Sequence, residues 1–93
     1  MRKKKIASIR KKLDILDGQI LNLIKKRTFL VDDVLKTKTF KKQIIDKKRI
    51  SVILKKIKHA SIKKKIDTQI TAHIWKSMIK AYINYEFRKF KKK

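Results

Sequence analysis

The chain has 93 residues, of which 30 are Lys or Arg and 7 are Asp or Glu, so its formal net charge at pH 7 is +23. A chain of this length is close to the lower size limit for an independent core, so association with a second chain has to be considered. Proline and cysteine are absent and Gly18 is the only glycine. The composition therefore excludes disulfides, cysteine metal sites and thiol nucleophiles, disfavours sandwiches, barrels and glycine-rich phosphate loops, and predicts an all-α protein.

The positive charge is spread along the whole chain, and lysine runs occupy residues 3–5 and 91–93. A basic surface attracts phosphate groups. However, the sequence has no zinc-finger spacing, no recognition-helix motif and no basic stripe with interleaved aromatic residues. We therefore interpret the lysines as a solvated surface and treat nucleic-acid binding as the less favoured alternative. No apolar run exceeds three residues, so we expect a cytoplasmic protein without a membrane span or a secretory segment.

The first predicted element is a long amphipathic helix from about residue 4 to about residue 39. Its apolar residues recur in steps of three and four, as in a heptad seam. The seam consists of Ile6, Ile9, Leu13, Leu16, Ile20, Leu23, Leu30 and Val34, with Arg27 at the step between the last two leucines. Such a helix would be about 50 Å long, which is too long for one small globule. We therefore expect the helix to protrude and to pair with a partner.

The remainder of the chain predicts two shorter helices. Residues 39–43 lose the periodicity and predict a connection. A second helix should begin near Asp46, whose carboxylate suits a helix start, and residues 59–65 predict a lysine-rich join. Asp67 suits the N-cap of a third helix that reaches about Phe90. The expected inward residues are Ile50, Ile53, Leu54 and Ile57 in the second helix and Ile70, Ile74, Trp75, Met78, Ile79, Tyr82 and Tyr85 in the third.

A few charged residues lie on or beside these inward faces. Arg27 lies in the seam of the first helix, Arg10 flanks the seam, and Lys38 follows Arg27 by eleven residues on nearly the same face. Arg49 lies at the inner edge of the second helix, and Glu86, the only glutamate, lies on the inner face of the third. A buried guanidinium without a partner is costly, so an anionic ligand is the simple explanation. The open alternative is that Arg27 reaches solvent or pairs with an acid of another chain.

Five short segments occur in order along the chain. Residues 9–17 place an arginine before an apolar-x-x-apolar-Asp unit, and residues 21–27 are leucine-rich and end in arginine. Residues 36–38 bring a lysine eleven positions after that arginine, residues 46–49 form a loop-to-helix turn, and residues 75–86 form a closing aromatic helix. This ordered set resembles the all-helical chorismate mutases, whose relatives include the isochorismate-pyruvate lyases. The resemblance covers essentially the whole chain, residues 1–93, as a single domain.

The resemblance implies a fold and a reaction. The family fold is an intertwined homodimer of three-helix chains, in which the long first helices pair and each active site draws on both chains. The family reaction is the Claisen rearrangement of chorismate to prephenate, a step of aromatic amino acid biosynthesis in the shikimate pathway, and it needs no metal and no cofactor. Catalysis in this family consists of holding a flexible dianion in its compact conformer and stabilising charge on the ether oxygen.

Position by position, the resemblance also implies a role for each charged residue. Arg10 from the partner chain and Arg27 from the same chain would each grip one substrate carboxylate, because a planar guanidinium binds a carboxylate through two parallel hydrogen bonds. Lys38 and Glu86 would flank the ether bond that breaks. The implied catalytic residues are Arg27, Lys38 and Glu86, and the implied substrate-binding residues are Arg10, Arg27, Lys38, Asp46, Arg49, Tyr82 and Glu86.

Two positions depart from the family pattern. Asp46 and Arg49 would line the ring-hydroxyl end of the substrate, but the glutamate that family members place just after this arginine is replaced by Ile50. A small serine of the third helix is replaced by Tyr82. Both departures resemble the lyase relatives as well as some mutase branches, whereas the carboxylate of Glu86 favours a mutase. We therefore predict a chorismate mutase. Isochorismate-pyruvate lyase is the same-fold alternative, and a basic helical dimer that binds nucleic acid is the alternative of another class.

Overall fold

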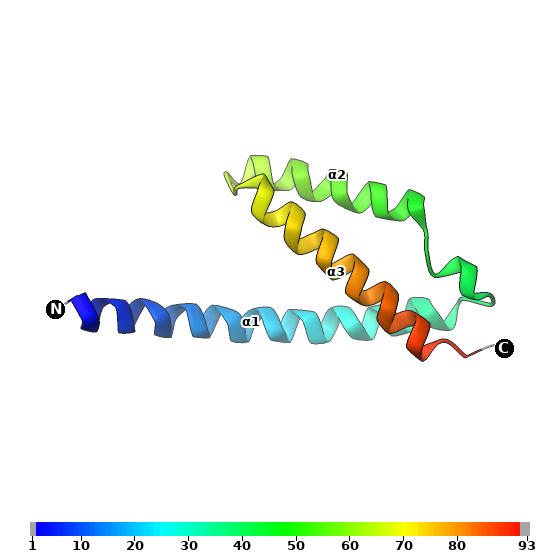
Figure 1. The fold of residues 1–93 in the computed structure, drawn as a ribbon, viewed down its shortest axis with the longest axis horizontal. Coiled ribbons are helices and arrows are strands. Elements are labelled where there is room, and N and C mark those ends of the chain that lie inside the picture. Colours follow the sequence, from blue (N-terminus) through cyan, green and yellow to red (C-terminus); the bar gives the residue numbers. More distant parts are fainter. Residues whose placement is uncertain (1, 92–93) are drawn as a thin grey trace. The chain divides into compact units, whose positions relative to one another are not determined.

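The computed structural model describes residues 2–91, and all the regular structure in this part of the chain is helical. The elements are α1 (Arg2–Lys36), a short 3₁₀ turn η1 (Lys41–Gln43), α2 (Lys47–Lys63) and α3 (Thr68–Lys89) (Figure 1). The prediction of an all-α chain with a long, a short and a medium helix is therefore confirmed. Two residues of the predicted solvated tail, Lys92 and Lys93, lie outside the described residues. Within the described part, no helix combines the length and the apolar character that crossing a membrane requires.

The chain divides into two compact units, one up to Asp33 and the other from Val34 onward, and each is described by itself. The first unit consists of most of α1. The second unit holds the last residues of α1, the connection that contains η1, and the helices α2 and α3.

α1 is unbroken over 35 residues, two residues longer at its start and three shorter at its end than predicted. Gly18 does not interrupt it, since a single glycine costs a helix interior only about 1 kcal/mol. The last turn tightens, as the backbone N–H groups of Thr37 and Lys38 donate to the carbonyls of Val34 and Leu35, each at 3.0 Å. Such tight bonds satisfy carbonyls that a helix end otherwise leaves without a partner.

The apolar seam of α1 is exposed along its length. Ile9, Leu16 and Leu23 are 48%, 51% and 62% exposed, and no residue of α1 is buried. Soluble monomers rarely expose a contiguous apolar surface of this kind. The seam therefore has the character of an interaction surface.

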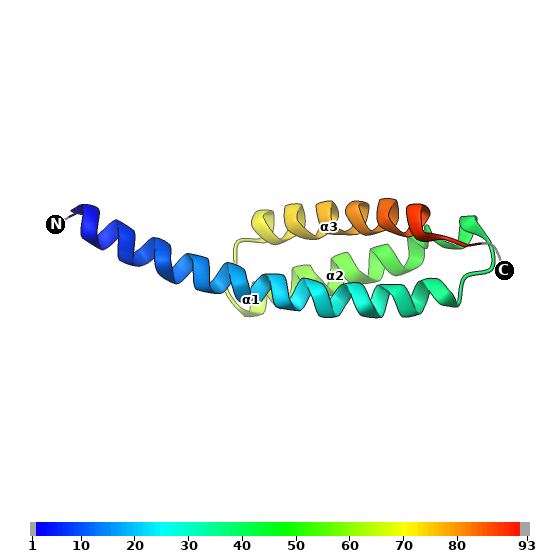
Figure 2. The ribbon, with the colours of Figure 1, turned by 90° about the horizontal axis from the view of Figure 1, so that it is seen from below.

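α2 and α3 pack against each other within the second unit (Figure 2). The half-buried residues of these helices include Ile50, Ile53, Leu54 and Ile57 of α2 and Trp75, Met78, Ile79 and Tyr82 of α3, as predicted from the pattern. The pattern was wrong for Ile70 and Ile74 of α3, which are 56% and 48% exposed. Two hydroxyl groups lie deeper than these side chains, because Ser61 and Thr71 are only 3% and 9% exposed. The inner side of this helix pair therefore combines an apolar stripe with one polar pair.

The polar pair joins α2 to α3 by a hydrogen bond between the hydroxyl oxygens of Ser61 and Thr71, which are 2.8 Å apart. The Ser61 hydroxyl also donates to the carbonyl of Ile57 at 2.6 Å. A hydroxyl has one proton to donate, and Thr71 has a second acceptor in the carbonyl of Thr68. That bond is 3.4 Å long, whereas Ser61 lies 2.6 Å from its carbonyl, so we assign Thr71 as the donor in the pair. Burial without a partner would cost either hydroxyl free energy, so the bond fixes how α2 and α3 face each other.

The predicted lysine-rich join over residues 59–65 is wrong, because α2 continues through Lys63. Lysine is a good helix former, and no glycine or proline lies in this stretch to end the helix. Ser61 follows Ile57 by four residues and so continues the inward face by one more turn. The weak apolar pattern concealed this turn, because its inward residue is polar.

The end of α2 is a Schellman motif. The N–H of Ile66 donates to the carbonyl of Ser61 at 2.8 Å, and the N–H of Lys65 donates to the carbonyl of Ile62 at 3.1 Å. Lys65 has a φ angle of 58°, which lies in the left-handed region. Glycine is the usual residue at this position, since a side chain there is strained.

Candidate active site

An open hollow of about 480 Å³ lies where the connection after α1 enters α2. It is lined by Lys38, Gln43, Ile45, Asp46 and Lys47. Two of the predicted site residues, Lys38 and Asp46, therefore come together here. The lining of the hollow thus includes both an ammonium group and a carboxylate, which could bind a ligand that carries a carboxylate and a hydroxyl.

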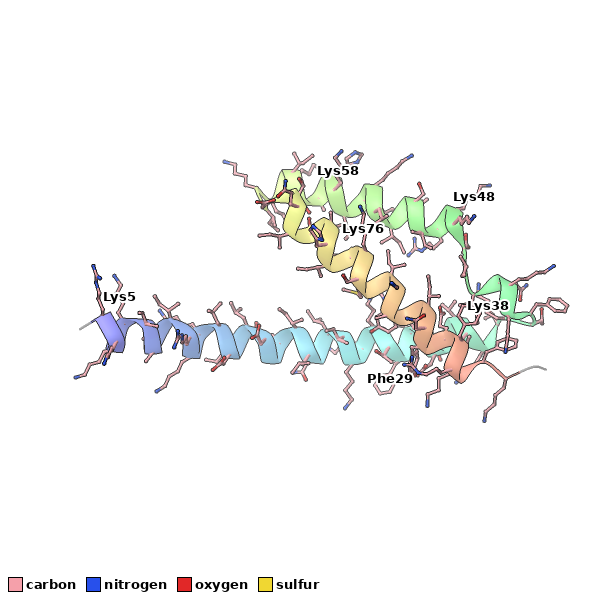
Figure 3. The ribbon with its side chains drawn as sticks, viewed as in Figure 1. Lys5, Phe29, Lys38, Lys48, Lys58 and Lys76 are labelled. Atoms are coloured by element: carbon pink, nitrogen blue, oxygen red, sulfur yellow. The ribbon has the colours of Figure 1, made fainter. Side chains whose placement is uncertain are left out.

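Lys38 and Arg27 differ from the other cations in their exposure. Among the cations that the structure describes, these two are half-buried and all others are exposed. Figure 3 shows two of the exposed lysines, Lys48 and Lys58, on α2. The prediction that Arg27 and Lys38 lie inward is thus confirmed, whereas Arg10 and Arg49 are exposed in the single chain.

The connection that carries Lys38 is held by the side chain of Gln43. The Gln43 amide oxygen accepts hydrogen bonds from the N–H of Thr39 at 2.7 Å and from the N–H of Phe40 at 3.0 Å. Ile44, the next residue, is 6% exposed and anchors the turn. Sequence reasoning missed Gln43. Its spacing, three residues after Phe40, is the spacing at which a Gln of a capping box reaches back to the residue before a helix, and this signal could have found it.

Asp46 begins α2 as predicted. One of its carboxylate oxygens, Oδ1, accepts a hydrogen bond from the backbone N–H of Arg49 at 3.0 Å. A carboxylate at this position stabilises a helix by satisfying a free N–H and by facing the positive end of the helix dipole. Asp46 therefore fixes the first turn of α2, and the same turn carries the exposed side chain of Arg49.

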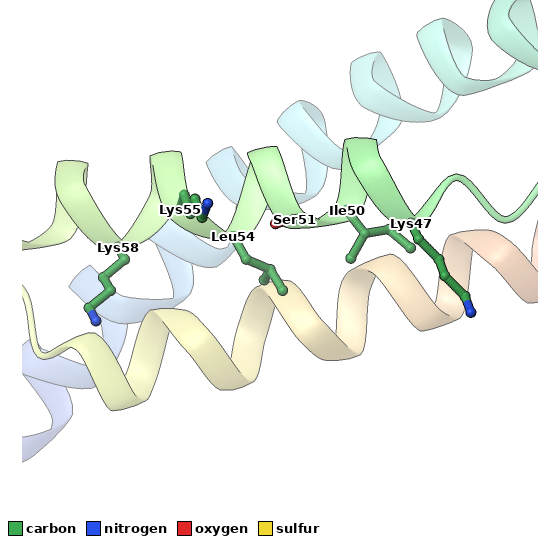
Figure 4. Close-up of a pocket in the computed structure, with 6 residues that line it drawn as sticks. All are labelled: Lys47, Ile50, Ser51, Leu54, Lys55 and Lys58. Atoms are coloured by element: carbon green, nitrogen blue, oxygen red, sulfur yellow. The ribbon is translucent and has the colours of Figure 1, made fainter.

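Ile50, which stands where the family has a glutamate, lies in an apolar setting. A second hollow of about 420 Å³ runs along α2 and is lined by Lys47, Ile50, Ser51, Leu54, Lys55 and Lys58. Figure 4 shows Ile50 and Leu54 pointing from α2 toward α3. Ile50 is half-buried, so this position contributes packing between the helices and offers no hydrogen-bonding group.

Tyr82 and Glu86 lie one turn apart on α3, and both are half-buried. Residues four apart in a helix share a face, so the two side chains belong to one surface. The ring of Tyr82 meets the ring of Tyr85 edge-on, with 6.3 Å between the ring centres and 89° between the ring planes. This aromatic contact restricts the orientation of Tyr82 beside Glu86.

Arg10 and Arg27 both belong to the first unit, on the same helix. They are seventeen residues apart in the sequence, which is about 25 Å along an α-helix. That separation is far greater than the span of a small dicarboxylate. The two arginines of one chain therefore cannot grip the same small ligand. Arg10 lines a shallow hollow of its own on α1 together with Lys3, Ile6, Ala7, Lys11 and Asp14.

No group of three or more His, Cys, Asp or Glu side chains in the described part of the chain is arranged to hold a metal ion. The charged side chains of the candidate site can act through charge and hydrogen bonding. The guanidinium of Arg27 and the ammonium of Lys38 can bind anions. The carboxyl group of Glu86 can accept a hydrogen bond, or donate one when it is protonated.

Comparison with known families adds to this picture. A model of the family described as chorismate mutase type II matches residues 9–87. The chain belongs to the chorismate mutase type II family. No curated protein and no solved structure matches the chain significantly.

The match to the chorismate mutase type II family confirms the resemblance that the sequence suggested. The matched range runs from before Arg10 to beyond Glu86, and it therefore contains all seven predicted site residues. It also spans both compact units, so the family pattern needs α1 together with α2 and α3.

Proposed function

We propose that the chain is a chorismate mutase, an isomerase that converts chorismate to prephenate. Family membership supports this activity. The observation that supports it at the level of residues is that the two half-buried cations described, Arg27 and Lys38, are the two cations for which the family resemblance implies a catalytic role. Half-burial strengthens their attraction for an anion, since the effective dielectric is lower than in water.

The active site is shared between two copies of the chain in this proposal. Arg10 and Arg27 lie too far apart on α1 to bind one ligand, so each site takes Arg27 from one chain and Arg10 from its partner. The exposed seam of α1 supplies the surface along which the copies pair. In the resulting homodimer the chain acts as a single domain over residues 1–93, with a cytoplasmic location as predicted from its composition.

The rearrangement is intramolecular. The ether C–O bond breaks while a new C–C bond forms between the enolpyruvyl group and the ring, and no atom enters or leaves. Arg10 of the partner and Arg27 bind one substrate carboxylate each and hold the dianion in its compact conformer. Lys38 donates a hydrogen bond to the ether oxygen as negative charge grows there. Glu86, in its protonated form, donates a second one.

The ring-hydroxyl end of the substrate lies at the start of α2. Asp46 lines the hollow there with its carboxylate, and Arg49 follows in the first turn. Ile50 supplies no polar group at this end. That departure favours, as the second candidate, an isochorismate-pyruvate lyase of the same fold, because the contacts that distinguish chorismate from isochorismate fall in this region.

The direct test is incubation of the purified chain with chorismate and with isochorismate separately, followed by identification of the products. We expect prephenate from chorismate. Release of pyruvate from isochorismate, without prephenate from chorismate, would identify the lyase instead. A chain that converts neither, and binds duplex DNA with an affinity that falls steeply with salt, would be the nucleic-acid-binding dimer.

Assembly is tested by sedimentation at micromolar concentration. We expect a species of about twice the chain mass, because the apolar seam of α1 needs a partner. A folded, compact monomer that is active would contradict the shared site. It would leave the reaction assignment to be judged from the products alone.

A further inference from the structure

The connection between α1 and α2 contains one side chain that organises it. Besides the two backbone N–H groups, the Gln43 amide oxygen is 3.2 Å from the hydroxyl of Thr39, which donates to it. A backbone N–H can only donate a hydrogen bond, so the oxygen rather than the nitrogen of the amide faces Thr39 and Phe40. The orientation of the Gln43 side chain is thereby fixed.

The bonding is reciprocal, because the backbone N–H of Gln43 donates to the carbonyl of Phe40 at 3.0 Å. The N–H of Ile44 donates to the carbonyl of Lys41, also at 3.0 Å. Residues 39–44 thus form a closed turn in which side chain and backbone hold each other. The buried side chain of Ile44 fixes one end of this turn.

The closed turn stands between two groups of the site. Lys38 directly precedes Thr39, and Asp46 follows Ile44 by two residues. Both line the hollow of about 480 Å³ that Gln43 also lines. Outside the helices, the backbone after Lys38 is held by the bonds of Thr39 and Phe40 to Gln43. The backbone before it is held by the bonds of Thr37 to Val34 and of Lys38 to Leu35.

We propose that Gln43 is a positioning residue, whose amide oxygen holds the turn so that Lys38 and Asp46 face the same hollow. The inference rests on the proposed function and deepens it. A lysine side chain is long and flexible, so the placement of its ammonium depends on a fixed backbone at its base. Displacement of a catalytic group by about 1 Å costs roughly a hundredfold in rate. Loosening the turn should therefore lower the rate of the chemical step more than it weakens substrate binding.

The test uses two substitutions at this position. Gln43→Met keeps the length of the side chain and removes the acceptor oxygen. Gln43→Glu keeps an oxygen that accepts from the same N–H groups. Lys41→Met is the matched control, because Lys41 is an exposed neighbour in the same turn whose carbonyl bond to Ile44 does not involve its side chain. For each variant, kcat and KM are measured with chorismate, and the exchange rates of the Thr39 and Phe40 amide protons are measured by NMR.

In Gln43→Met we expect the two amide protons to exchange about tenfold faster, as for the loss of one ordinary hydrogen bond. We also expect kcat to fall by about tenfold or more, with a smaller change in KM. Gln43→Glu should restore amide protection and most of kcat, and Lys41→Met should resemble the wild type in both measurements. The proposal is supported if all three variants show these expected values of kcat and amide exchange.

Two outcomes would overturn it while leaving the chorismate mutase proposal intact. In one, the wild type is active and Gln43→Met loses amide protection but keeps its kcat, so the turn does not matter to catalysis. In the other, Gln43→Glu keeps the amide protection but is as slow as Gln43→Met, so the amide group acts on the substrate itself. A wild type that converts no chorismate would instead overturn the proposed function, and this inference with it.

Discussion

α1 and the α2–α3 pair both carry apolar side chains at helical spacing, but they differ in how far these side chains are covered within the chain. α1 has no buried residue and leaves its apolar seam exposed, with Leu30 at 65%. α2 and α3 cover part of each other's apolar faces and bury a hydrogen-bonded pair of hydroxyls between them, while Ile70 and Ile74 of α3 stay exposed. The pair therefore makes part of its packing within the chain, whereas the seam of α1 stays exposed. If the sites are shared as proposed, the helix that is least complete in the monomer is also the one that brings both arginines.

Arg27 tests the α1 side of this comparison and carries the largest expected effect. Arg27→Leu completes the heptad seam and removes a partly desolvated charge, so thermal unfolding should occur at an unchanged or higher temperature. The same change should weaken transition-state stabilisation by about 3 kcal/mol or more, because a charged contact to the substrate is lost. This loss is obtained from the ratio of the kcat/KM values of wild type and variant. Simultaneous loss of fold and activity would mean that Arg27 is a structural ion-pair partner.

Mixing two inactive variants tests whether α1 works across chains. Arg10→Ala and Arg27→Ala homodimers should each be weakly active. After subunit exchange, a heterodimer has one site with both arginines and one site with neither, so activity should return in proportion to the heterodimers formed. A mixture that stays as weak as its parents would place Arg10 and Arg27 of one chain at the same site, which the length of α1 does not allow for a straight helix.

Glu86 tests the chemistry assigned to α3. An ionised carboxylate cannot donate a hydrogen bond to the ether oxygen, whereas a protonated one can. Activity should therefore be highest where Glu86 holds its proton in the complex and should decline as rising pH removes it. Glu86→Gln carries a permanent donor, so its pH–rate profile should be flat over that range. Identical profiles of wild type and variant would remove Glu86 from the role of ether-oxygen donor.

The parts of this structure that sequence could predict are those fixed by local chemistry. The starts of α2 and α3 were predicted at Asp46 and Asp67, and both carboxylates accept a hydrogen bond from a backbone N–H of the following turn. A helix start depends on a few adjacent residues, so its signal is local. The end of α2 was missed, because its inward residue is Ser61 and its left-handed cap is a lysine rather than a glycine.

The family could be predicted from the sequence, whereas the assembly of the candidate site could not. The order and spacing of the arginines, Lys38 and Glu86 suggested the family, and the family match confirmed it. The role of Gln43 could not be derived from periodicity, since it depends on the fold of a turn without regular structure. The way in which the proposed shared site would form between two chains likewise cannot be derived from the apolar pattern of one chain. The single chain shows only that the seam of α1 is exposed.

The hydroxyl pair tests the other side of the comparison, the closed packing of α2 on α3. Ser61→Ala removes the acceptor at 2.8 Å and leaves the buried Thr71 hydroxyl only the longer bond of 3.4 Å to the carbonyl of Thr68, so it should cost about 1 kcal/mol or more of unfolding free energy. Thr71→Val should cost less, because Ser61 still donates to the carbonyl of Ile57. The double variant should be less destabilised than the sum of the two. Strict additivity in denaturant unfolding at one fixed protein concentration would mean that the two hydroxyls are not coupled.

Lys65 provides the smallest expected effect, and its direction is stabilising. Its φ of 58° is strained for a residue with a side chain and free of strain for glycine. Lys65→Gly should therefore stabilise the chain by up to about 1 kcal/mol, because the relief of strain is partly offset by the extra freedom that glycine gains in the unfolded chain.

Lys64→Gly is the matched control. Lys64 has a φ of −85°, so glycine there relieves nothing and should destabilise slightly. Both variants remove one lysine of the same exposed turn, so the difference between their unfolding free energies cancels most of the change in charge. A Lys65→Gly chain no more stable than Lys64→Gly would show that the left-handed cap does not form in solution, and that the packing of α2 against α3 alone sets where α2 ends.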